Sequence, residues 1–268
     1  MQETLHILGT GNATVTKCYN TCFALQQGEE YFLVDTGGGN GILAQLKKAN
    51  IPMEQIHEIF LSHEHTDHLL GLIWLIRMIA TKMKKGLYTG DLQIYCHANL
   101  KQTILTIAKL TVQDKFYNMI GQRIHLVTVA DGETRTVMGQ ATTFFDIGST
   151  KAEQYGFLRI LPESKRFAFL GDEPYRDCEE QYAKGADWML HEAFCLYADR
   201  EKYQPYEKHH VTVKEACEHA ETLGAKNLIL YHTEDKTIVT RKAAYTAEGT
   251  PYFSGNLFVP DDLDIMRL

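Results

Sequence analysis

The chain has 268 residues, of which 44% are hydrophobic and 23% are charged, and its formal net charge is −7. This is ordinary for a globular protein with a large core, so we expect residues 1–268 to form one domain. The acidic balance argues against a broad basic surface for nucleic acid. No apolar run is long enough to span a membrane, no signal segment opens the chain, and the six cysteines form no CxxC pair. We therefore expect a cytoplasmic protein with reduced thiols and no membrane contact.

The first hundred residues alternate short apolar runs with turn residues. They predict, in chain order, strands at 5–8, 22–25 and 31–34, a helix at 42–49, a strand at 59–61, a helix at 69–83 and a strand at 92–96. The glycine-rich stretch 35–41 lacks the lysine of a P-loop and the spacing of a dinucleotide fingerprint. We interpret it as a tight turn that brings Asp35 close to the metal ligands proposed below.

Apolar runs separated by turn residues continue through the rest of the chain. They predict helices at 100–110 and 214–223 and strands at 124–129, 141–147, 155–160, 167–170, 188–190, 227–231 and 257–259. Arg241 and Lys242 fall in a segment that we interpret as surface. Strands dominate each half, with helices between them. We therefore predict an α/β (α+β) fold of two sheets packed together with helices outside, a four-layer αββα sandwich, over a doubly wound parallel sheet.

The stretch Ser62-His63-Glu64-His65-Thr66-Asp67-His68 places four metal-type ligands within six residues. Imidazole and carboxylate suit a borderline divalent metal. In an extended segment His63 and His65 project from the same face, while Asp67 and His68 follow where the chain turns into the 69–83 helix. This geometry favours two adjacent metal positions over one. Further polar residues stand at predicted strand ends, namely Asp35, Asp172, His191 and His232, and one shared sheet edge would gather them into one site.

These motifs resemble the metallo-β-lactamase fold superfamily, and within it the ribonuclease Z-like branch. The central motif, together with Gly71, is the hallmark of the superfamily. The remaining matches span nearly the whole chain: 8–12 with 20–22, 34–37, Leu170-Gly171-Asp172, Leu190-His191-Glu192-Ala193 with Phe194 in place of a threonine, His209-His210-Val211-Thr212, and Tyr231-His232-Thr233. The resemblance implies a metal-dependent hydrolase on this fold.

The resemblance also implies a dinuclear site. One metal would take His63 and His65, the other would take Asp67, His68 and His232, and Asp172 would bridge them. Zinc is the expected metal, with manganese or iron as alternatives. Two such ions can activate water and clamp the oxygens of an in-line phosphoryl displacement. Asp67 could also accept a proton from that water, and His210, paired with Glu192, could stabilise the developing charge or protonate the leaving oxygen. The plain alternative for Glu192 and His210 is a surface ion pair.

The chain departs from the family pattern at the first metal. The superfamily supplies a third histidine there, from a loop that follows a strand. Here the corresponding stretch is Asp146-Ile147-Gly148-Ser149, so Gly148 is expected to replace that histidine. The first metal would then be weakly held, unless Asp146 substitutes as a ligand.

A second departure concerns the substrate. Ribonuclease Z proper carries a long arm for tRNA between the third histidine and the bridging aspartate, and residues 149–171 leave no room for one. We therefore expect a small phosphodiester or another small ester, with tRNA an unlikely substrate and a homodimer possible. The alternative is a non-catalytic or redox metal-binding protein with an impaired first metal site.

Overall fold

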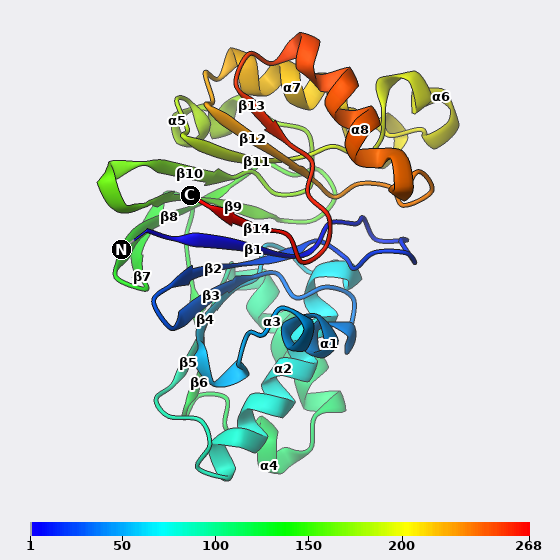
Figure 1. Cartoon of the computed structure of the whole chain (residues 1–268). Coiled ribbons are helices and arrows are strands. Elements are labelled where there is room, and N and C mark those ends of the chain that lie inside the picture. Colours follow the sequence, from blue (N-terminus) through cyan, green and yellow to red (C-terminus); the bar gives the residue numbers. More distant parts are fainter. Residues whose placement is uncertain (1) are drawn as a thin grey trace.

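The computed structural model describes residues 2–268 and contains two seven-stranded sheets that face each other (Figure 1). The first sheet has the order β14-β1-β2-β3-β4-β5-β6. Its strands are β1 (Thr4–Gly9), β2 (Cys22–Gln27), β3 (Glu30–Val34), β4 (Ile56–Phe60), β5 (Leu92–Cys96), β6 (Ile124–Thr128) and β14 (Ile265–Arg267). Strands β3 to β6 run parallel to one another, whereas β14, β1, β2 and β3 pair antiparallel.

The second sheet has the order β13-β12-β11-β10-β9-β8-β7. Its strands are β7 (Glu133–Val137), β8 (Gln140–Asp146), β9 (Tyr155–Ile160), β10 (Arg166–Phe169), β11 (Trp188–Glu192), β12 (Asn227–Tyr231) and β13 (Asn256–Phe258). Strands β10 to β13 are parallel and β7 to β10 are antiparallel.

Helices cover the outer face of each sheet (Figure 1). The first sheet carries α1 (Gly41–Lys48), α2 (Thr66–Lys84), α3 (Ala98–Thr111) and α4 (Asp114–Tyr117). The second carries α5 (Glu180–Ala183), α7 (Val213–Thr222) and α8 (Ile238–Gly249), with α6 (Arg200–Tyr203) at its edge. Separate apolar clusters fill each helix–sheet interface and the space between the sheets. The predicted four-layer αββα sandwich is therefore confirmed.

Aromatic side chains dominate the layer between the two sheets. Phe60 of β4 contacts Phe144 of β8 and Phe157 of β9, with ring centroids 5.0 Å and 5.6 Å apart. Phe23 of β2 packs against Phe169 of β10 at 5.4 Å. Rings of this size bury a large apolar area, and tilted or edge-on pairs add a favourable electrostatic term. These contacts lock the two sheets together close to the ends of β4 and β10, the strands that lead into the polar motifs.

The parallel strands explain why distant motifs meet. Strands β3 and β4 are parallel neighbours in one sheet, and β10, β11 and β12 are parallel neighbours in the other. The carboxyl ends of parallel strands lie at the same edge, where ligands bind in open α/β sheets. Asp35, His63, Asp172 and His232 all follow such ends. His191, which was expected to join them, lies within β11 and contacts His219 of α7 at 3.1 Å instead.

Two expectations at the end of the chain need revision. The predicted surface position of Arg241 is wrong: this residue lies within α8, is fully buried, and pairs with Asp261 at 3.0 Å. Its guanidinium also donates to the side chains of Thr10 and Thr233. Strand β14, which no pattern predicted, pairs with β1. Among residues 2–268, no helix combines the length and the apolar character that a membrane crossing requires.

Candidate metal centre

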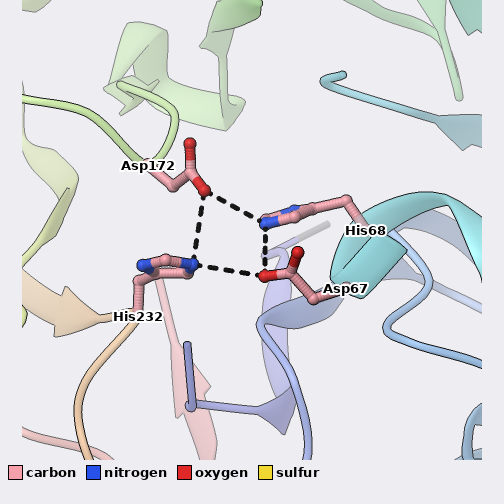
Figure 2. A group of neighbouring side chains, drawn as sticks. All are labelled: Asp67, His68, Asp172 and His232. Carbon is pink, nitrogen blue, oxygen red and sulfur yellow. Dashed lines mark ion pairs between the residues drawn. The ribbon is translucent and has the colours of Figure 1, made fainter. Parts of the chain in front are cut away.

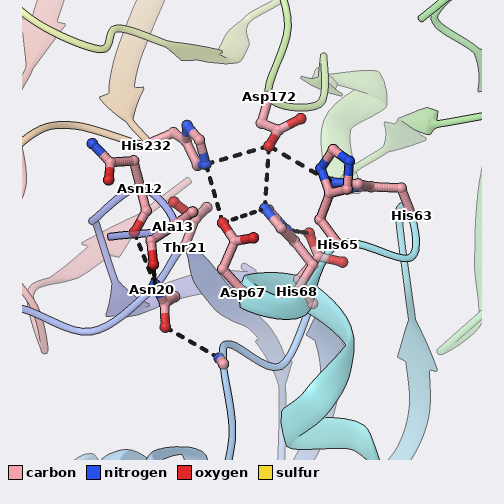
Figure 3. Close-up of polar contacts among 12 residues, drawn as sticks. Asn12, Ala13, Asn20, Thr21, His63, His65, Asp67, His68, Asp172 and His232 are labelled. Carbon is pink, nitrogen blue, oxygen red and sulfur yellow. Dashed lines mark hydrogen bonds and ion pairs between the residues drawn. The ribbon is translucent and has the colours of Figure 1, made fainter. Parts of the chain in front are cut away.

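The central motif crosses from a strand to a helix. Strand β4 ends at Phe60, and α2 begins at Thr66, so His63 and His65 lie in the extended connection. Asp67 and His68 occupy the first turn of α2, where their side chains turn back toward that connection (Figure 3). His63, Asp67 and His68 are buried, whereas His65 is partly exposed.

Four side chains meet in what we term the second donor group: Asp67, His68, Asp172 and His232. Asp67 Oδ2 lies 3.3 Å from His68 Nε2 and 3.5 Å from His232 Nε2. Asp172 Oδ2 lies 3.2 Å and 3.3 Å from the same two nitrogens. Figure 2 shows these contacts as a closed ring of alternating oxygen and nitrogen atoms.

Three side chains form what we term the first donor group: His63, His65 and Asp172. His63 Nε2 lies 2.9 Å from His65 Nδ1 and 3.7 Å from Asp172 Oδ2. The same carboxylate oxygen therefore faces both groups (Figure 3). This is the arrangement of a bridging ligand between two adjacent positions.

The donor spacing fits a divalent ion. Atoms that bind one tetrahedral zinc ion at about 2.1 Å lie about 3.4 Å apart from one another. The four contacts of the second donor group span 3.2 to 3.5 Å. In addition, His68 Nε2 and His232 Nε2 are buried and have no hydrogen-bond partner among the described residues. Such orphan nitrogens call for an explanation, and a metal ion supplies one.

Asp35 braces the motif from behind. Its Oδ2 lies 2.7 Å from His68 Nδ1, which leaves His68 Nε2 pointing at the second donor group. Its Oδ1 accepts the Ser62 N–H at 2.8 Å, and the Ser62 hydroxyl also donates to this carboxylate. Ser62 Oγ in turn lies 2.9 Å from His63 Nδ1. A carboxylate behind a ligating histidine fixes its tautomer and ring orientation. The interpretation of the glycine-rich turn, which placed Asp35 beside the motif, agrees with this arrangement.

The two groups differ electrostatically. Burial lowers the pKa of His63 well below its usual value, which keeps its imidazole neutral. Burial would also lower the pKa of His68, but the carboxylates of Asp67 and Asp35 outweigh it and raise that pKa well above its usual value. Burial likewise opposes the charge of Asp172, yet His63, His232 and His68 hold its pKa well below the ordinary range. The centre is thus built to retain carboxylate anions.

Glu192 and His210 lie beside the second donor group and are not a surface pair. Both are buried, and Glu192 Oε2 lies 3.5 Å from His210 Nδ1. The N–H of Val211 donates to Glu192 Oε1 at 2.6 Å, which fixes the carboxylate. The His210 ring stacks on Phe194 with centroids 4.9 Å apart and lies 5.0 Å from the His232 ring. Burial lowers the pKa of His210 to about 4 and raises that of Glu192 well above its usual value.

A cavity of about 500 Å³ opens onto both donor groups. Lys151, Lys208 and His210 line it, and so does Asn12, which lies in the loop between β1 and β2. The amide of Asn20 holds this loop by donating to the Asn12 carbonyl at 2.8 Å, and its oxygen accepts the Gly38 N–H at 3.2 Å (Figure 3). The cavity is therefore lined by two lysines in addition to the carboxylates of Glu64, Asp67 and Asp172.

Asp146 and Gly148, which were expected to substitute for or replace the third histidine, do not lie at the first donor group. Asp146 belongs to none of the donor groups, and its Oδ1 accepts the N–H of Gly148 at 2.8 Å. Gly148 is exposed, and a Cβ there would contact Arg176 and Cys178. The side chain that lies against the first donor group is Gln154, whose Nε2 donates to Asp172 Oδ1 at 2.6 Å and lies 3.1 Å from His63 Nδ1.

Several site residues had no individual signal in the sequence. Gln154 stands 91 residues after His63 and 18 before Asp172, so no spacing rule links it to either. Lys151 reaches the cavity from the loop between β8 and β9, and Lys208 from the short 3₁₀ helix Tyr206–Lys208, and neither segment carries a periodic pattern. Phe194 stood out only as a departure from the expected threonine, and the stacking on His210 now accounts for a ring at that position.

Comparison with known proteins places this geometry in a family. A model of the β-lactamase superfamily domain matches residues 30–233, which include both donor groups and Glu192. The chain belongs to this superfamily. A ribonuclease Z of Phocaeicola vulgatus is 24% identical over 302 aligned positions, covering 90% of this chain and 91% of that protein. The predicted resemblance to the ribonuclease Z-like branch of the metallo-β-lactamase fold is thereby confirmed.

Solved structures agree on the fold. The metallo-β-lactamase fold protein YhfI from Bacillus subtilis superposes with a TM-score of 0.80 at 21% identity, and all of both chains is covered. The short form of human tRNase Z superposes with a TM-score of 0.73 at 20% identity, over 98% of each chain. Fold, family and the buried His/Asp cluster together identify a metal-dependent hydrolase that binds a divalent metal. The alternative of a non-catalytic or redox protein is not favoured.

Proposed function

We propose that this protein hydrolyses a small phosphodiester with the aid of two divalent ions, most consistent with zinc and with manganese or iron as alternatives. His63, His65 and Asp172 would hold one ion, and Asp67, His68, His232 and the same Asp172 would hold the other. The observation that carries the proposal is Asp172 Oδ2, which lies 3.2 to 3.7 Å from nitrogens of both donor groups. Imidazole and carboxylate are the donors of hydrolytic zinc sites.

When bound, the ions would activate a water molecule at neutral pH and withdraw charge from the phosphoryl oxygens. Asp67 lines the cavity, and the neighbouring histidines outweigh its burial and lower its pKa, so its carboxylate stays ionised and would accept a hydrogen bond and then the proton from that water. His210 faces the same cavity and, neutral at pH 7, would donate its N–H to the developing negative charge. Phe194 stacks on its ring, and Glu192 Oε2 lies 3.5 Å from its Nδ1. A group so placed would stabilise charge in the transition state.

The charge around the cavity supports a phosphate ester over a neutral ester. Lys151 and Lys208 line the cavity although the chain as a whole is acidic. Lys151 Nζ donates to the Lys208 carbonyl at 3.1 Å and lies 3.7 Å from Glu173 Oε1. Lys208 Nζ lies over the Phe194 ring, 5.0 Å from its centroid, and this ring stacks on His210. Cationic groups beside a metal centre stabilise the anionic phosphoryl group in the ground state and in the transition state.

The size of the substrate follows from the connection between β9 and β10. These strands form a hairpin with only the short 3₁₀ turn Pro162–Ser164 between them, so no arm extends from the region expected to grip tRNA. The alignment with the Phocaeicola ribonuclease Z is longer than this chain, so that relative contains residues this chain lacks. We therefore favour a small phosphodiester over tRNA. The names of the relatives make tRNA the competitor to test.

The test compares two substrates on one enzyme preparation. We expect hydrolysis of bis(p-nitrophenyl) phosphate that depends on added zinc or manganese and disappears with chelator. We expect no cleavage of a precursor tRNA with a 3′ extension at the same enzyme concentration. Precise tRNA cleavage would overturn the substrate assignment, and no metal-dependent turnover of either compound would overturn the proposed function.

Three further properties belong to this proposal. We place the protein in the cytoplasm, because all six cysteines are free thiols. We treat residues 1–268 as one domain, because β14 near the end of the chain pairs with β1 near its start. A homodimer stays a prediction, which light scattering coupled to size-exclusion chromatography would test.

A further inference from the structure

Gln154 is a fully buried polar side chain that takes no part in the mechanism above. Its amide nitrogen donates to Asp172 Oδ1 at 2.6 Å and lies 3.1 Å from His63 Nδ1. The side chain is therefore wedged between the shared carboxylate and a histidine of the first donor group. Buried amide groups are nearly always hydrogen-bonded, so the contact with Asp172 gives the Gln154 amide the partner that it needs.

The backbone holds Gln154 in this place. Its carbonyl accepts the N–H of Ile147 at 3.0 Å, which closes the base of the loop between β8 and β9. The next residue, Tyr155, donates its N–H to the Ser62 carbonyl at 3.1 Å. Gln154 is thus attached directly beside the Ser62-His63 segment, and its side chain has little freedom to leave the centre.

The residue before Asp172 makes room for the amide. Gly171 has φ +74°, and a Cβ there would lie 3.1 Å from Gln154 Nε2 and 2.9 Å from Ile147 Cδ1. A larger residue would push the amide away and would also be strained in this left-handed conformation. The hydroxyl of Tyr231 donates to the Gly171 carbonyl, which fixes the turn from the other side.

Asp172 has two oxygens with different surroundings. Oδ1 accepts from Gln154, and Oδ2 faces His63 Nε2 at 3.7 Å, His68 Nε2 at 3.2 Å and His232 Nε2 at 3.3 Å. A carboxylate without the first contact could rotate about its χ2 torsion, which is broad. The amide contact thus leaves one oxygen alone to serve both donor groups.

We infer that Gln154 is a positioning residue that aims Asp172 Oδ2 at both ions and so sustains ion binding at the first donor group, which lacks a third histidine. This inference rests on the proposed two-ion function. The first donor group depends on Gln154 more than the second does, because Asp172 is one of three donors in the first group and one of four in the second.

The test removes the donor and keeps the shape. Gln154→Met is unbranched and of similar length but has no N–H. Loss of an outer-shell partner typically weakens metal binding by about 10- to 100-fold. We expect Co²⁺, used as the only metal, to bind wild-type protein in two steps, followed by visible absorbance and by competition with a chelating dye. In Gln154→Met the weaker step should shift by this factor, while the tighter step moves by less.

Two variants control for a general loss of stability. Gln45 is also a buried glutamine, and its amide donates to the Leu8 carbonyl at 2.6 Å, away from both donor groups. Gln45→Met should lower the unfolding temperature of metal-free protein and leave both Co²⁺ steps unchanged. Gln154→Asn keeps an amide but shortens its reach by one methylene, so it should reproduce the selective loss if Gln154→Met fails to fold.

The outcomes separate this inference from the proposed function. If wild-type protein binds a single Co²⁺ ion, the two-ion function fails. If wild-type protein binds two ions and both Gln154 variants bind them with unchanged affinity, the positioning role is overturned. Equal weakening of both steps in the Gln154 variants would overturn the claim that the first donor group depends on it more.

Discussion

The two donor groups share one carboxylate and differ in almost everything else. The second group has four donors, from the first turn of α2, the loop after β10 and the end of β12. The first group has three, of which His63 and His65 come from one short extended segment. His68 is backed by a carboxylate at 2.7 Å, whereas His63 is backed by a hydroxyl at 2.9 Å.

In the two-ion function that we propose, this difference would let the site tolerate the loss of a ligand. The second group has enough donors to hold an ion without help, and its carboxylates keep anionic charge at the centre. The first group depends on contacts outside its donors, from Ser62 on one side and from Gln154 on the other. Outer-shell partners that orient ligands affect affinity nearly as strongly as the ligands do.

The largest effect should come from removing the shared donor. Asp172→Ala deprives both groups at once, so we expect both ions to be lost and phosphodiester hydrolysis to fall by at least about 10⁴-fold, the upper end for one catalytic group. Elemental analysis after gel filtration, together with bis(p-nitrophenyl) phosphate hydrolysis, measures this. Two retained ions in Asp172→Ala would show that the groups are independent.

The next largest effect should leave the ions in place. His210→Gln removes the imidazole that faces the cavity, so we expect kcat/KM to fall by about 10²–10⁴-fold with unchanged metal content. The comparison is with Lys109→Gln, an exposed position at the end of α3 that should alter neither quantity. Loss of an ion in His210→Gln would instead assign this residue to the second donor group.

A smaller effect should come from the residues behind the ligating histidines, which support the two donor groups differently. Asp35→Asn weakens the support of His68 directly and that of His63 through Ser62, so both ions should bind about 10- to 100-fold more weakly. Ser62→Ala removes the hydroxyl that contacts His63 and Asp35 but keeps the Asp35–His68 contact, so it should weaken one ion by about tenfold or less. Co²⁺ titration of both variants checks this. Identical Co²⁺ binding curves for the two variants would contradict the prediction that Asp35 supports both donor groups and Ser62 supports only one.

The smallest effect lies outside the centre and concerns stability. Burial and the neighbouring His219 lower the pKa of His191 to about 3. The unfolded chain, with a histidine pKa of about 6.5, binds more protons between these values, so stability should fall as pH drops from about 6.5 toward 3. This group contributes at most about 1.4 kcal/mol per pH unit. Urea unfolding of metal-free protein at pH 7, 6 and 5 should show a shallower slope for His191→Gln.

Prediction from sequence succeeded where local pattern carries the information. The apolar runs that end in polar residues predicted the strands beside the centre. The four candidate ligands between His63 and His68 predicted a buried His/Asp cluster suited to a divalent metal, because their spacing matches a strand-to-helix crossing. It failed where partners are distant in the chain. Arg241 was assigned to the surface because an arginine in an unrecognised helix has no local signal of burial, and its partners Thr10 and Asp261 come from both ends of the chain.

The chain by itself determined the sandwich architecture and the hydrolytic metal chemistry, because strand periodicity and ligand spacing are local properties. Which residues bind the ions stays a prediction. Only the tertiary structure decided how the first donor group is supported. Neither Asp146 nor Gly148 reaches that group, and Gln154 lies against it because the loop between β8 and β9 closes onto Ser62. Such contacts arise because β9 is antiparallel to β10, so that its start lies beside the end of β10 and meets the segment after β4 from the other sheet. No sequence window contains this packing.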